Sequence, residues 1–350
     1  KIKKYIAMKK FLFVIFLMSI GVLLQAQDVH FSQIYEAPLA INPSFTGYFD
    51  GNHRIAGNYK SQWNNIQKGF NTFDLSYEYS FYNPAKQSGF LGIGLLFYND
   101  VAGPMKLSTQ NYTLNVAYHV RVGEGNYIGA GIYGGYVQKA FDDEDLQWGS
   151  QYDENYPGFN PTLPSGETFE KTSFGVPDFG FGLQWNMIKG ARTMSSNDGY
   201  RVNLGVGLFH LNQPKYQFYT GSEEQLKMRI AIHAQGQIGI ENTNLSIMPR
   251  FLYMLQGKQD EILPGLLLRY TLKEESHYTG FAKAIYLTMG GYYRIGDAAI
   301  AQLMLEIGDL GIGFSYDINV SDLSAVTNSN GGFEVSLRYI IKNKANISYH

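Results

Sequence analysis

The sequence contains no cysteine and few charged residues. Without cysteine, the chain has no disulfide, no thiolate metal site and no lipidated N-terminal cysteine. Charged residues make up 17% of the chain and the formal net charge is -2, which gives no electrostatic basis for a nucleic-acid partner. The apolar run near the start, from Phe11 to Leu24, is shorter than the roughly 20 residues of a membrane-spanning helix.

That apolar run has the form of a signal peptide. Lys9 and Lys10 follow Met8 and precede the run, and the small residue Ala26 stands before Gln27. This pattern predicts residues 1–26 as a signal peptide with an upstream extension, cleaved between Ala26 and Gln27. The alternative, an uncleaved anchor, suits so short a run poorly. Cleavage would leave 23 basic and 30 acidic residues, an acidic exported protein.

Glycine and aromatic residues are abundant, with 39 Gly, 27 Tyr and 23 Phe. This mixture favours extended strands over helices. Beyond residue 50 apolar and polar residues alternate, as in "TFDLSYEYSF" (72–81), "NYTLNVAYHVRV" (111–122) and "LGIGFSYDINV" (310–320). The alternation predicts strands with one apolar and one polar face.

Fourteen such segments can be counted. Many are longer than strands of soluble sheets and long enough to cross a bilayer at a tilt. They lie near 52–63, 70–81, 88–100, 108–122, 125–140, 174–187, 200–211, 226–240, 244–256, 262–272, 281–294, 297–307, 310–320 and 331–342.

The connections between these segments fall into two sets. If the first strand begins at the periplasmic side, the external connections include 142–173, 212–225 and 321–330. The periplasmic ones include 123–125, 241–244 and the two-residue turn Gly308–Asp309, with 188–199 and 273–280 somewhat longer. Short periplasmic turns and long external loops are typical of transmembrane barrels, and an even strand number allows closure. We therefore predict an all-β transmembrane outer-membrane β-barrel of about 14 antiparallel strands at 52–342, with an N-terminal latch or plug at 27–51 and a C-terminal tail at 343–350.

The polar face of the strands should line the barrel lumen. It carries charges of both signs, which favours cross-strand pairing and a partly filled interior over a single-ion filter. The predicted lumen residues are Asp74, Glu78, His119, Arg121, Arg229, His233, Glu306, Asp317, Glu334 and Arg338.

Three features were candidates for chemistry. "GAGIYG" (Gly129–Gly134) matches a dinucleotide-binding pattern, but it lies inside an alternating strand instead of between a strand and a helix. The acidic run Asp142–Asp145 could hold calcium but lacks the order of a calcium loop, so a solvated loop is favoured and calcium stays open. His210 has the outward parity of Leu204 and Leu208, which predicts an interfacial residue, and no serine motif accompanies it to make a hydrolase. We expect no enzyme and no cofactor.

The stretch "HFSQIYEAPLAINPSFTG" (His30–Gly47) follows neither helical nor strand periodicity. Its prolines and the Asn42-Pro43 pair predict a defined turn, and its aromatics supply apolar area that must pack against something. It is either a latch against its own barrel or a contact for a periplasmic partner. For the second case the candidate partner-binding residues are Phe31, Tyr35, Asn42 and Pro43.

The connection 142–173 is far longer than an ordinary hairpin loop. Its aromatic content argues against disorder, and Tyr and Trp dominate binding energy at protein interfaces. We predict a docking loop with candidate partner-binding residues Trp148, Tyr152, Tyr156 and Phe159. The alternative is a lid folded into the barrel mouth.

Several motifs carry a family resemblance: "QDVHFSQIYEAPLAINPSFTG" (27–47), "YKSQW" (59–63), "NDVAGP" (99–104), "LFHLNQP" (208–214), "GGYYRIGDA" (290–298), "GFSYDINVSDL" (313–323) and "GGFEVSLRYI" (331–340). Together they resemble the PorP/SprF family of outer-membrane proteins of the Bacteroidota, from Gln27 to Ile340. The sequence departs modestly, with Phe45-Thr46 before Gly47 where Ala-Tyr-Ala is commoner, and with Lys60 where many members have Arg.

The resemblance implies a non-enzymatic role in type IX secretion and gliding motility. It implies help in secreting or anchoring a cell-surface adhesin that bears a type IX C-terminal sorting domain, and contact with type IX components in the periplasm. The third expected partner, after the adhesin and the periplasmic components, is the lipid of the outer membrane that surrounds the barrel. The alternative function is a passive porin or a transporter of small hydrophobic solutes.

Overall fold

The computed structural model describes residues 30–62, 69–83, 88–142, 146–152, 158–166, 172–190, 197–216, 218, 225–274, 283–321 and 330–341. Several predicted features lie outside these residues. They are the signal peptide with its cleavage site Ala26–Gln27, most of the acidic run (143–145), Tyr156, and the C-terminal tail at 343–350.

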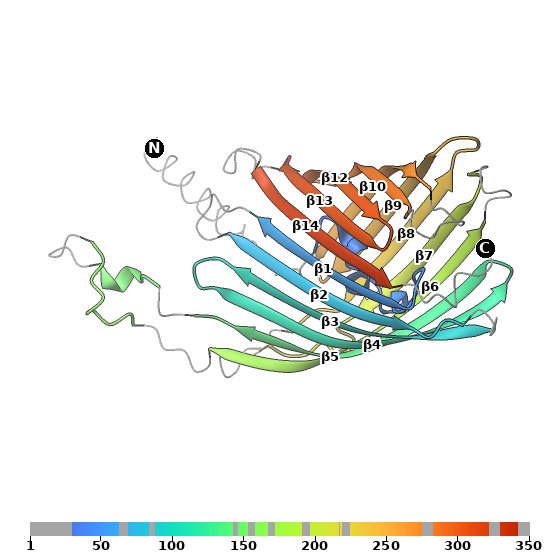
Figure 1. Ribbon diagram of the computed structural model, residues 1–350. Coiled ribbons are helices and arrows are strands. Elements are labelled where there is room, and N and C mark those ends of the chain that lie inside the picture. Colours follow the sequence, from blue (N-terminus) through green and yellow to red (C-terminus); the bar gives the residue numbers. More distant parts are fainter. Residues whose placement is uncertain are drawn as a thin grey trace, which may run out of the picture.

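The chain forms one closed barrel of fourteen antiparallel strands, in which β1 pairs with β14 (Figure 1). The predicted fold class is confirmed, and the strand limits agree within a few residues because alternation marks them well. Among the described residues, no helix is long and apolar enough to cross a membrane. The strands are β1 (His53–Gln62), β2 (Phe70–Ser80), β3 (Gly89–Ala102), β4 (Leu107–Gly123), β5 (Asn126–Ala140), β6 (Ser173–Lys189), β7 (Tyr200–Phe209), β8 (Arg229–Gly239), β9 (Leu245–Gln256), β10 (Gln259–Lys273), β11 (Ile285–Arg294), β12 (Ala298–Ile307), β13 (Leu310–Asn319) and β14 (Asn330–Ile341).

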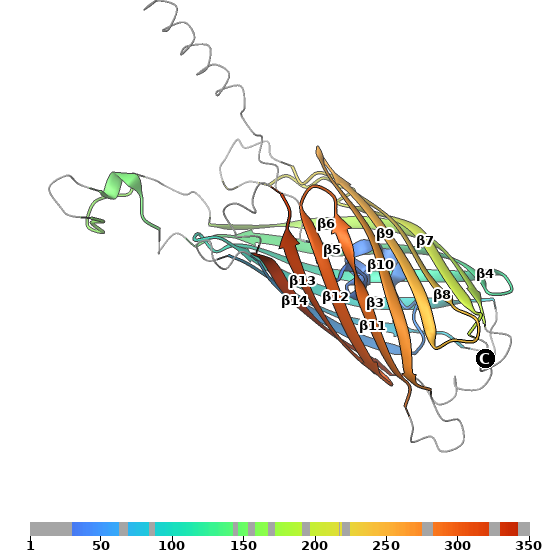
Figure 2. The ribbon, with the colours of Figure 1, turned by 90° about the horizontal axis from the view of Figure 1, so that it is seen from above.

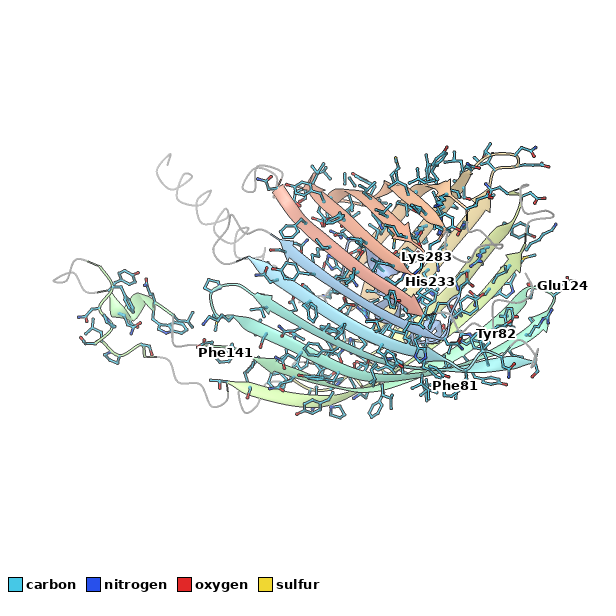
Figure 3. The ribbon with its side chains drawn as sticks, viewed as in Figure 1. Phe81, Tyr82, Glu124, Phe141, His233 and Lys283 are labelled. Atoms are coloured by element: carbon cyan, nitrogen blue, oxygen red, sulfur yellow. The ribbon has the colours of Figure 1, made fainter. Side chains whose placement is uncertain are left out.

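The barrel has two distinct ends. The long-connection end joins odd to even strands and carries 141–172 between β5 and β6 and 210–228 between β7 and β8. The opposite end, here called the short-turn end, joins even to odd strands. It carries 124–125 and the turn Gly308–Asp309, together with the longer connections 190–199 and 274–284. In Figure 3, Glu124 and Phe141 mark the short-turn end and the long-connection end respectively.

The two faces of the wall follow the alternation. In β2 the side chains of Leu75 and Tyr77 are exposed, whereas Asp74 and Glu78 are buried. Among the ten predicted lumen residues, seven are buried: Asp74, Glu78, His119, Arg229, His233, Asp317 and Glu334. Glu306 and Arg338 form an ion pair, with 2.6 Å between Oε1 and Nη2. The polar face is therefore the inner one.

The outer face carries two rows of exposed aromatic side chains. Such rows are the interfacial girdles of outer-membrane barrels, where amphipathic rings sit at the level of the lipid head groups. The row nearer the long-connection end contains Tyr59, Phe73, Tyr112, Tyr136, Phe179, Tyr316 and Phe333, and the row nearer the short-turn end contains Tyr77, Phe81, Tyr118, Trp185, Tyr270 and Tyr339.

Candidate functional site

Residues 30–51, here called the plug, enter the barrel, and 31–47 are buried inside it except for the half-buried Ala40 (Figures 1 and 2). The plug contains η1 (Ile34–Glu36), α2 (Pro38–Ile41) and η2 (Pro43–Phe45). Each proline begins its helix, where the fixed φ is favourable and no N–H is needed. Asn42 caps η2 because its Oδ1 accepts hydrogen bonds from the Ser44 N–H at 2.9 Å and the Ser44 hydroxyl at 2.7 Å. The turn predicted at Asn42-Pro43 is therefore present.

The plug supplies the hydrophobic core of the barrel. The side chains of Phe31, Ile34, Ile41 and Phe45 are each at most 4% exposed. They belong to one cluster with inward-facing apolar residues of the wall, among them Ala231, Leu252, Leu263, Leu267 and Ile300. Burial of this kind contributes about 1.5–3 kcal/mol for each large side chain.

Glycines of the wall make room for the plug. A Cβ atom on Gly131 would lie 2.6 Å from the backbone of Pro43. Gly92 and Gly207 face the plug backbone in the same way, and Gly182 faces the Asn42 side chain. The "GAGIYG" sequence belongs to this surface: its Gly129 accommodates the His119 ring and its Gly131 the plug, so these glycines serve close packing within a strand.

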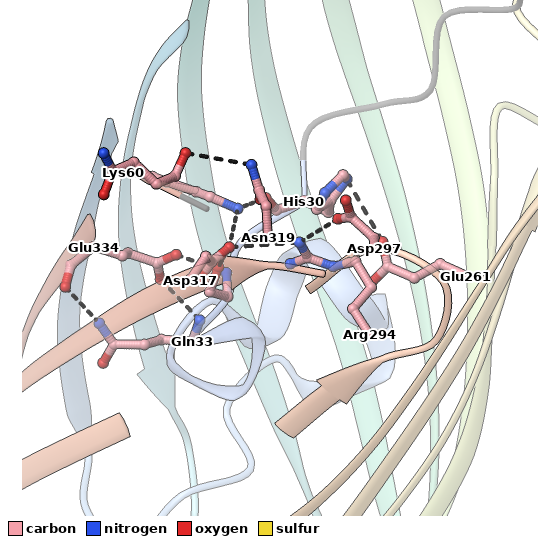
Figure 4. A network of polar contacts seen from close by, with 11 residues as sticks. His30, Gln33, Lys60, Glu261, Arg294, Asp297, Asp317, Asn319 and Glu334 are labelled. Carbon is pink, nitrogen blue, oxygen red and sulfur yellow. Dashed lines mark hydrogen bonds and ion pairs between the residues drawn. The ribbon is translucent and has the colours of Figure 1, made fainter. Parts of the chain in front are cut away.

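The first part of the plug is held by charged side chains (Figure 4). Glu334 accepts hydrogen bonds from the backbone N–H groups of Ser32 at 2.6 Å and Gln33 at 3.0 Å. The Ser32 hydroxyl donates to Asp317 at 2.7 Å. Lys60 lies 3.7 Å from Asp317, which compensates one buried carboxylate with one buried ammonium.

His30 begins the described chain next to this network. Its carbonyl oxygen accepts a hydrogen bond from Lys60 Nζ at 3.1 Å, and its Nδ1 lies 3.7 Å from Glu261 Oε2. Desolvation lowers the pKa of His30 well below its usual value, and the nearby Arg294 and Lys60 lower it further. The lowered pKa favours a neutral imidazole at this contact over an ion pair with Glu261.

The plug bridges the seam at which the barrel closes. On the β1 side, Asn58 Nδ2 donates to the Glu36 carbonyl at 3.5 Å. On the β14 side, Arg338 Nη1 donates to Glu36 Oε2 at 2.9 Å, and the Ser336 hydroxyl donates to Gln33 Oε1 at 2.9 Å. Both ends of the barrel sequence are thus bound to the same short segment.

The middle of the plug is held by Tyr35 and Asn42. Burial raises the pKa of Tyr35, so its hydroxyl stays protonated and donates to the Phe251 carbonyl at 2.7 Å. Asn42 Nδ2 donates to the Leu183 carbonyl at 2.9 Å and lies 2.9 Å from Nε2 of His233, which is labelled in Figure 3.

The end of the plug is held at β4 and β2. His119 Nε2 lies 2.9 Å from the Thr46 carbonyl oxygen. The Gly47 N–H donates to Glu78 Oε2 at 3.0 Å, and Glu78 also accepts a hydrogen bond from Arg54 Nε at 2.7 Å. His119 and Glu78 are therefore part of the surface that seats the plug and not a free polar surface.

The expected outward position of His210 is wrong. β7 ends at Phe209, and His210 has a φ of 56°, in the left-handed region, so its side chain turns inward and is 2% exposed. Its Nδ1 lies 2.9 Å from Asp178 Oδ2, which also accepts a hydrogen bond from the Tyr133 hydroxyl at 2.8 Å. Parity fails here because a positive φ breaks strand alternation.

The long connection lies outside the barrel. Its described parts, 146–152 and 158–166, are placed beyond the long-connection end in both views of the ribbon (Figures 1 and 2). Tyr152 and Phe159 form an antiparallel bridge with ring centroids 6.0 Å apart, and the Tyr152 side chain is 53% exposed. Gln151 is buried and donates to the Leu163 carbonyl at 3.0 Å, which ties the two parts together.

The predicted partner-binding residues thus fall into two separate places. Phe31, Tyr35, Asn42 and Pro43 are buried in the plug, whereas Trp148, Tyr152 and Phe159 lie on the long connection. Partner binding by either group stays a prediction. Within the described ranges, no group of three or more His, Cys, Asp or Glu residues could hold a metal ion.

The barrel has distant likenesses among solved structures. It aligns with the toluene transporter TbuX of Ralstonia pickettii at 10% identity and a TM-score of 0.44, covering 90% of this chain and 96% of the other. It aligns with the CymD monoaromatic hydrocarbon channel at 10% identity and a TM-score of 0.45, covering 91% of this chain and 95% of the other. It also aligns with BamA of Haemophilus ducreyi lacking POTRA domains 1–3, at 11% identity and a TM-score of 0.40, covering 83% of this chain and 70% of the other. Likenesses this distant say nothing about function.

No curated protein matches the sequence. A family match covers nearly the whole barrel, because residues 23–339 fit the family described as type IX secretion system membrane protein PorP/SprF. The match agrees with the fourteen-stranded barrel, its two aromatic girdles and its place in the outer membrane. The chain belongs to the PorP/SprF family of type IX secretion system membrane proteins.

Proposed function

We propose that this protein helps to secrete or anchor a cell-surface adhesin with a type IX C-terminal sorting domain, without catalysing a reaction. The observation that carries the proposal is the filled lumen. The plug occupies the interior with buried apolar side chains, and wall glycines are fitted to its backbone. A barrel with a filled lumen is suited to binding other proteins at its exposed ends and not to passing solutes through its interior.

The filled lumen separates this proposal from a passive porin. A porin needs a continuous aqueous channel lined by solvated polar residues. In this barrel, inward-facing polar residues such as Glu78, Glu334 and His233 are at most 1% exposed and contact the plug. A transporter of small hydrophobic solutes would likewise require the plug to move aside.

The surface we assign to the adhesin is the long connection. Its exposed Tyr152 and partly buried Phe159 present an aromatic pair on a segment ordered by hydrogen bonds from Gln151. Aromatic side chains held in place before binding contribute strongly to protein interfaces because little conformational entropy is lost. Long connections of outer-membrane barrels face the cell exterior, where an adhesin would be found.

A second contact, with periplasmic components of type IX secretion, belongs to the opposite end. The short-turn end presents charged side chains, among them Glu124 and Lys283, both labelled in Figure 3. We assign the periplasmic contact to these turns and not to the buried plug.

The test replaces the aromatic pair. In the double variant Y152A/F159A, the adhesin should be lost from the cell surface while the barrel still assembles, as shown by heat-modifiable migration in gels. The matched control Y152F keeps the ring and should retain the adhesin. Unchanged adhesin in Y152A/F159A would remove the long connection from the proposal.

A conductance measurement tests the rival function. The purified barrel in a planar bilayer should show no steady conductance, because the plug stays seated. A stable open channel in the unaltered protein would favour the porin over the proposal.

A further inference from the structure

The strands of the barrel wall differ in length, and β6 therefore has a free edge at the long-connection end. We infer that this edge, at residues 173–175, binds an extended strand of the surface adhesin, which adds to the sheet above the membrane. The inference rests on the adhesin proposed above, and it names the place at which the backbone of the adhesin pairs with the barrel.

β6 is longer than the strand that follows it. It pairs with β5 along nearly its whole length, from Ser173 to Met187. It pairs with β7 only from Phe181, because β7 ends at Phe209. The first residues of β6 therefore have a neighbouring strand on one side only. Figure 1 shows β5 and β6 extending towards the long connection.

The hydrogen bonds show which backbone groups of β6 face the missing neighbour. In an antiparallel sheet, the N–H and C=O groups of successive residues point alternately to the two neighbouring strands. The Thr172 C=O accepts a hydrogen bond from the Phe141 N–H at 3.0 Å and thus faces β5. The Phe179 C=O accepts one from the Leu211 N–H at 3.0 Å and thus faces the β7 side. Even-numbered residues of β6 therefore bond to β5, and odd-numbered residues face the β7 side.

This alternation leaves four backbone groups at the free edge, the N–H and C=O of Ser173 and of Gly175. No described residue forms a hydrogen bond with them on the β7 side. The edge ends at Pro177, which has no N–H and whose C=O accepts a hydrogen bond from Asn212 Nδ2 at 2.7 Å. Two donors and two acceptors in a row match the hydrogen-bonding groups of an added β-strand.

The free edge lies above the membrane. Phe179 belongs to the aromatic row nearer the long-connection end, and Gly175 and Ser173 lie about 13 and 20 Å further along the strand, at about 3.3 Å for each residue. Unpaired backbone groups are not tolerated in the hydrocarbon region, whereas water solvates them above it. The edge is therefore open to the cell exterior, where an adhesin would bind.

The side chains around the edge indicate what the added strand should carry. On the inner face, Phe174 packs against Tyr216 and Phe218 of the β7–β8 connection, with ring centroids 5.3 and 4.6 Å away. On the outer face, Tyr136 lies against Gly175, where a Cβ atom would collide with its ring. Both faces offer aromatic surface to a neighbouring strand. The partner segment should therefore be extended and rich in apolar or aromatic side chains.

The adhesin is the occupant because the edge continues the surface already assigned to it. Ser173 directly follows the connection 141–172, which carries Tyr152 and Phe159. A partner held by that aromatic pair binds the edge as a second site on the same molecule, so the two contacts reinforce each other. A second copy of the barrel and a segment of this chain are the rival occupants, and the experiments separate them.

Two variants of Ser173 test the backbone edge. S173P removes the N–H at the free edge and should leave the ladder with β5 intact, because the backbone groups of Ser173 face away from β5. S173A, the matched control, keeps the N–H and removes only the hydroxyl. Surface proteins are labelled on intact cells with a membrane-impermeant biotin reagent and quantified, and heat-modifiable migration confirms that both barrels assemble. We expect S173P, but not S173A, to lower the surface amount of the protein that Y152A/F159A loses by about 2- to 10-fold, as for one lost hydrogen bond.

A photo-cross-linker identifies the occupant of the edge. Ser173→p-benzoylphenylalanine is irradiated on intact cells, and the cross-linked peptides are identified by mass spectrometry. We expect a peptide of the same surface protein. A cross-link to a second copy of the barrel, a cross-link within this chain alone, or no cross-link would overturn the inference.

The β6 edge and the long connection can fail separately. If Y152A/F159A loses the surface protein and S173P keeps it, the long connection stands and the β6 edge is refuted. If S173A loses it as S173P does, the hydroxyl is responsible and the edge is again refuted. If S173P lowers a surface protein that cross-links to position 173 while Y152A/F159A keeps it, the edge is supported and the long connection is not. If neither variant changes any surface protein, both are refuted.

Discussion

The plug and the long connection contain the same short motif in opposite surroundings. In the plug, Asn42-Pro43-Ser44 forms a turn in which Asn42 Oδ1 accepts from the Ser44 N–H at 2.9 Å and its hydroxyl at 2.7 Å. In the long connection, Asn160-Pro161-Thr162 forms the same turn, with distances of 3.0 and 2.7 Å. Asn42 is 0% exposed, whereas Asn160 is only partly buried. The local sequence therefore specifies the turn, and the burial of the turn determines how much its hydrogen bonds contribute to the stability of the protein.

The largest difference should follow deletion of each segment. Deletion of 31–47 removes five large apolar side chains that are at most 4% exposed, so the free energy of unfolding should fall by more than about 7 kcal/mol, at about 1.5 kcal/mol or more for each side chain. Deletion of 146–166 should leave it unchanged. The temperature at which heat-modifiable migration is lost compares the stability of the two deletion variants. Equal losses in both would show that the plug stabilises the barrel no more than the long connection does.

A smaller contrast comes from two glycines. In G131V the new side chain would collide with Pro43, since a Cβ already lies 2.6 Å from its backbone, and overpacking costs about 1–3 kcal/mol. A Cβ atom on Gly149, by contrast, meets no atom of the described residues within 4 Å, so G149V should be tolerated. Urea titrations of the two variants in detergent should separate them, and a stable G131V would mean that the plug is loosely seated.

The shared motif gives the most closely matched pair. N42A removes the bond to the Leu183 carbonyl and the two bonds to Ser44 inside the barrel, at about 1–3 kcal/mol. N160A removes the same local bonds where water can replace them, so its effect should stay within about 0.5 kcal/mol. Similar losses of unfolding free energy in both variants would show that the turn itself, and not its burial, is decisive.

The smallest contrast is between two tyrosine hydroxyls. Y35F removes a buried hydrogen bond to the Phe251 carbonyl and should lower the free energy of unfolding by about 0.5–1.5 kcal/mol. Y152F removes a bond to Gln147 on an exposed segment and should have no measurable effect on unfolding. A destabilising Y152F would indicate that the long connection is more firmly packed than its exposure suggests.

Sequence reasoning predicted the strands well and the interior only in part. The alternation of apolar and polar residues predicted the strands of the barrel wall, because successive side chains of a strand point to opposite faces. It also identified Asp74, Glu78 and Glu334 as lumen residues. It could not identify Glu334 as the acceptor for Ser32, because that contact joins residues 302 positions apart. It misplaced His210 because nothing in the sequence marks the left-handed turn after Phe209.

The two predicted binding segments illustrate the same limit. Aromatic residues and prolines without period two indicated that His30–Gly47 packs against something, and left open whether this is its own barrel or a periplasmic partner. Glycines inside the strands, such as Gly131 and Gly182, are the sequence feature that predicts a close approach of another segment to the barrel wall. The position of the plug depends on contacts spread over many strands, which leave no local signal in the sequence.

The contacts of the plug across the β1–β14 seam have a consequence for the order of folding. Asn58 of β1 and Ser336 and Arg338 of β14 all bind the plug, so the plug and the closing strand pair share one set of hydrogen bonds. The plug is synthesised first and β14 last, yet Gln33 and Glu36 already present partners for Ser336 and Arg338. The plug is thus a template for the final strand pairing. E36A should therefore slow the appearance of the closed, heat-modifiable form during refolding, whereas N160A should not.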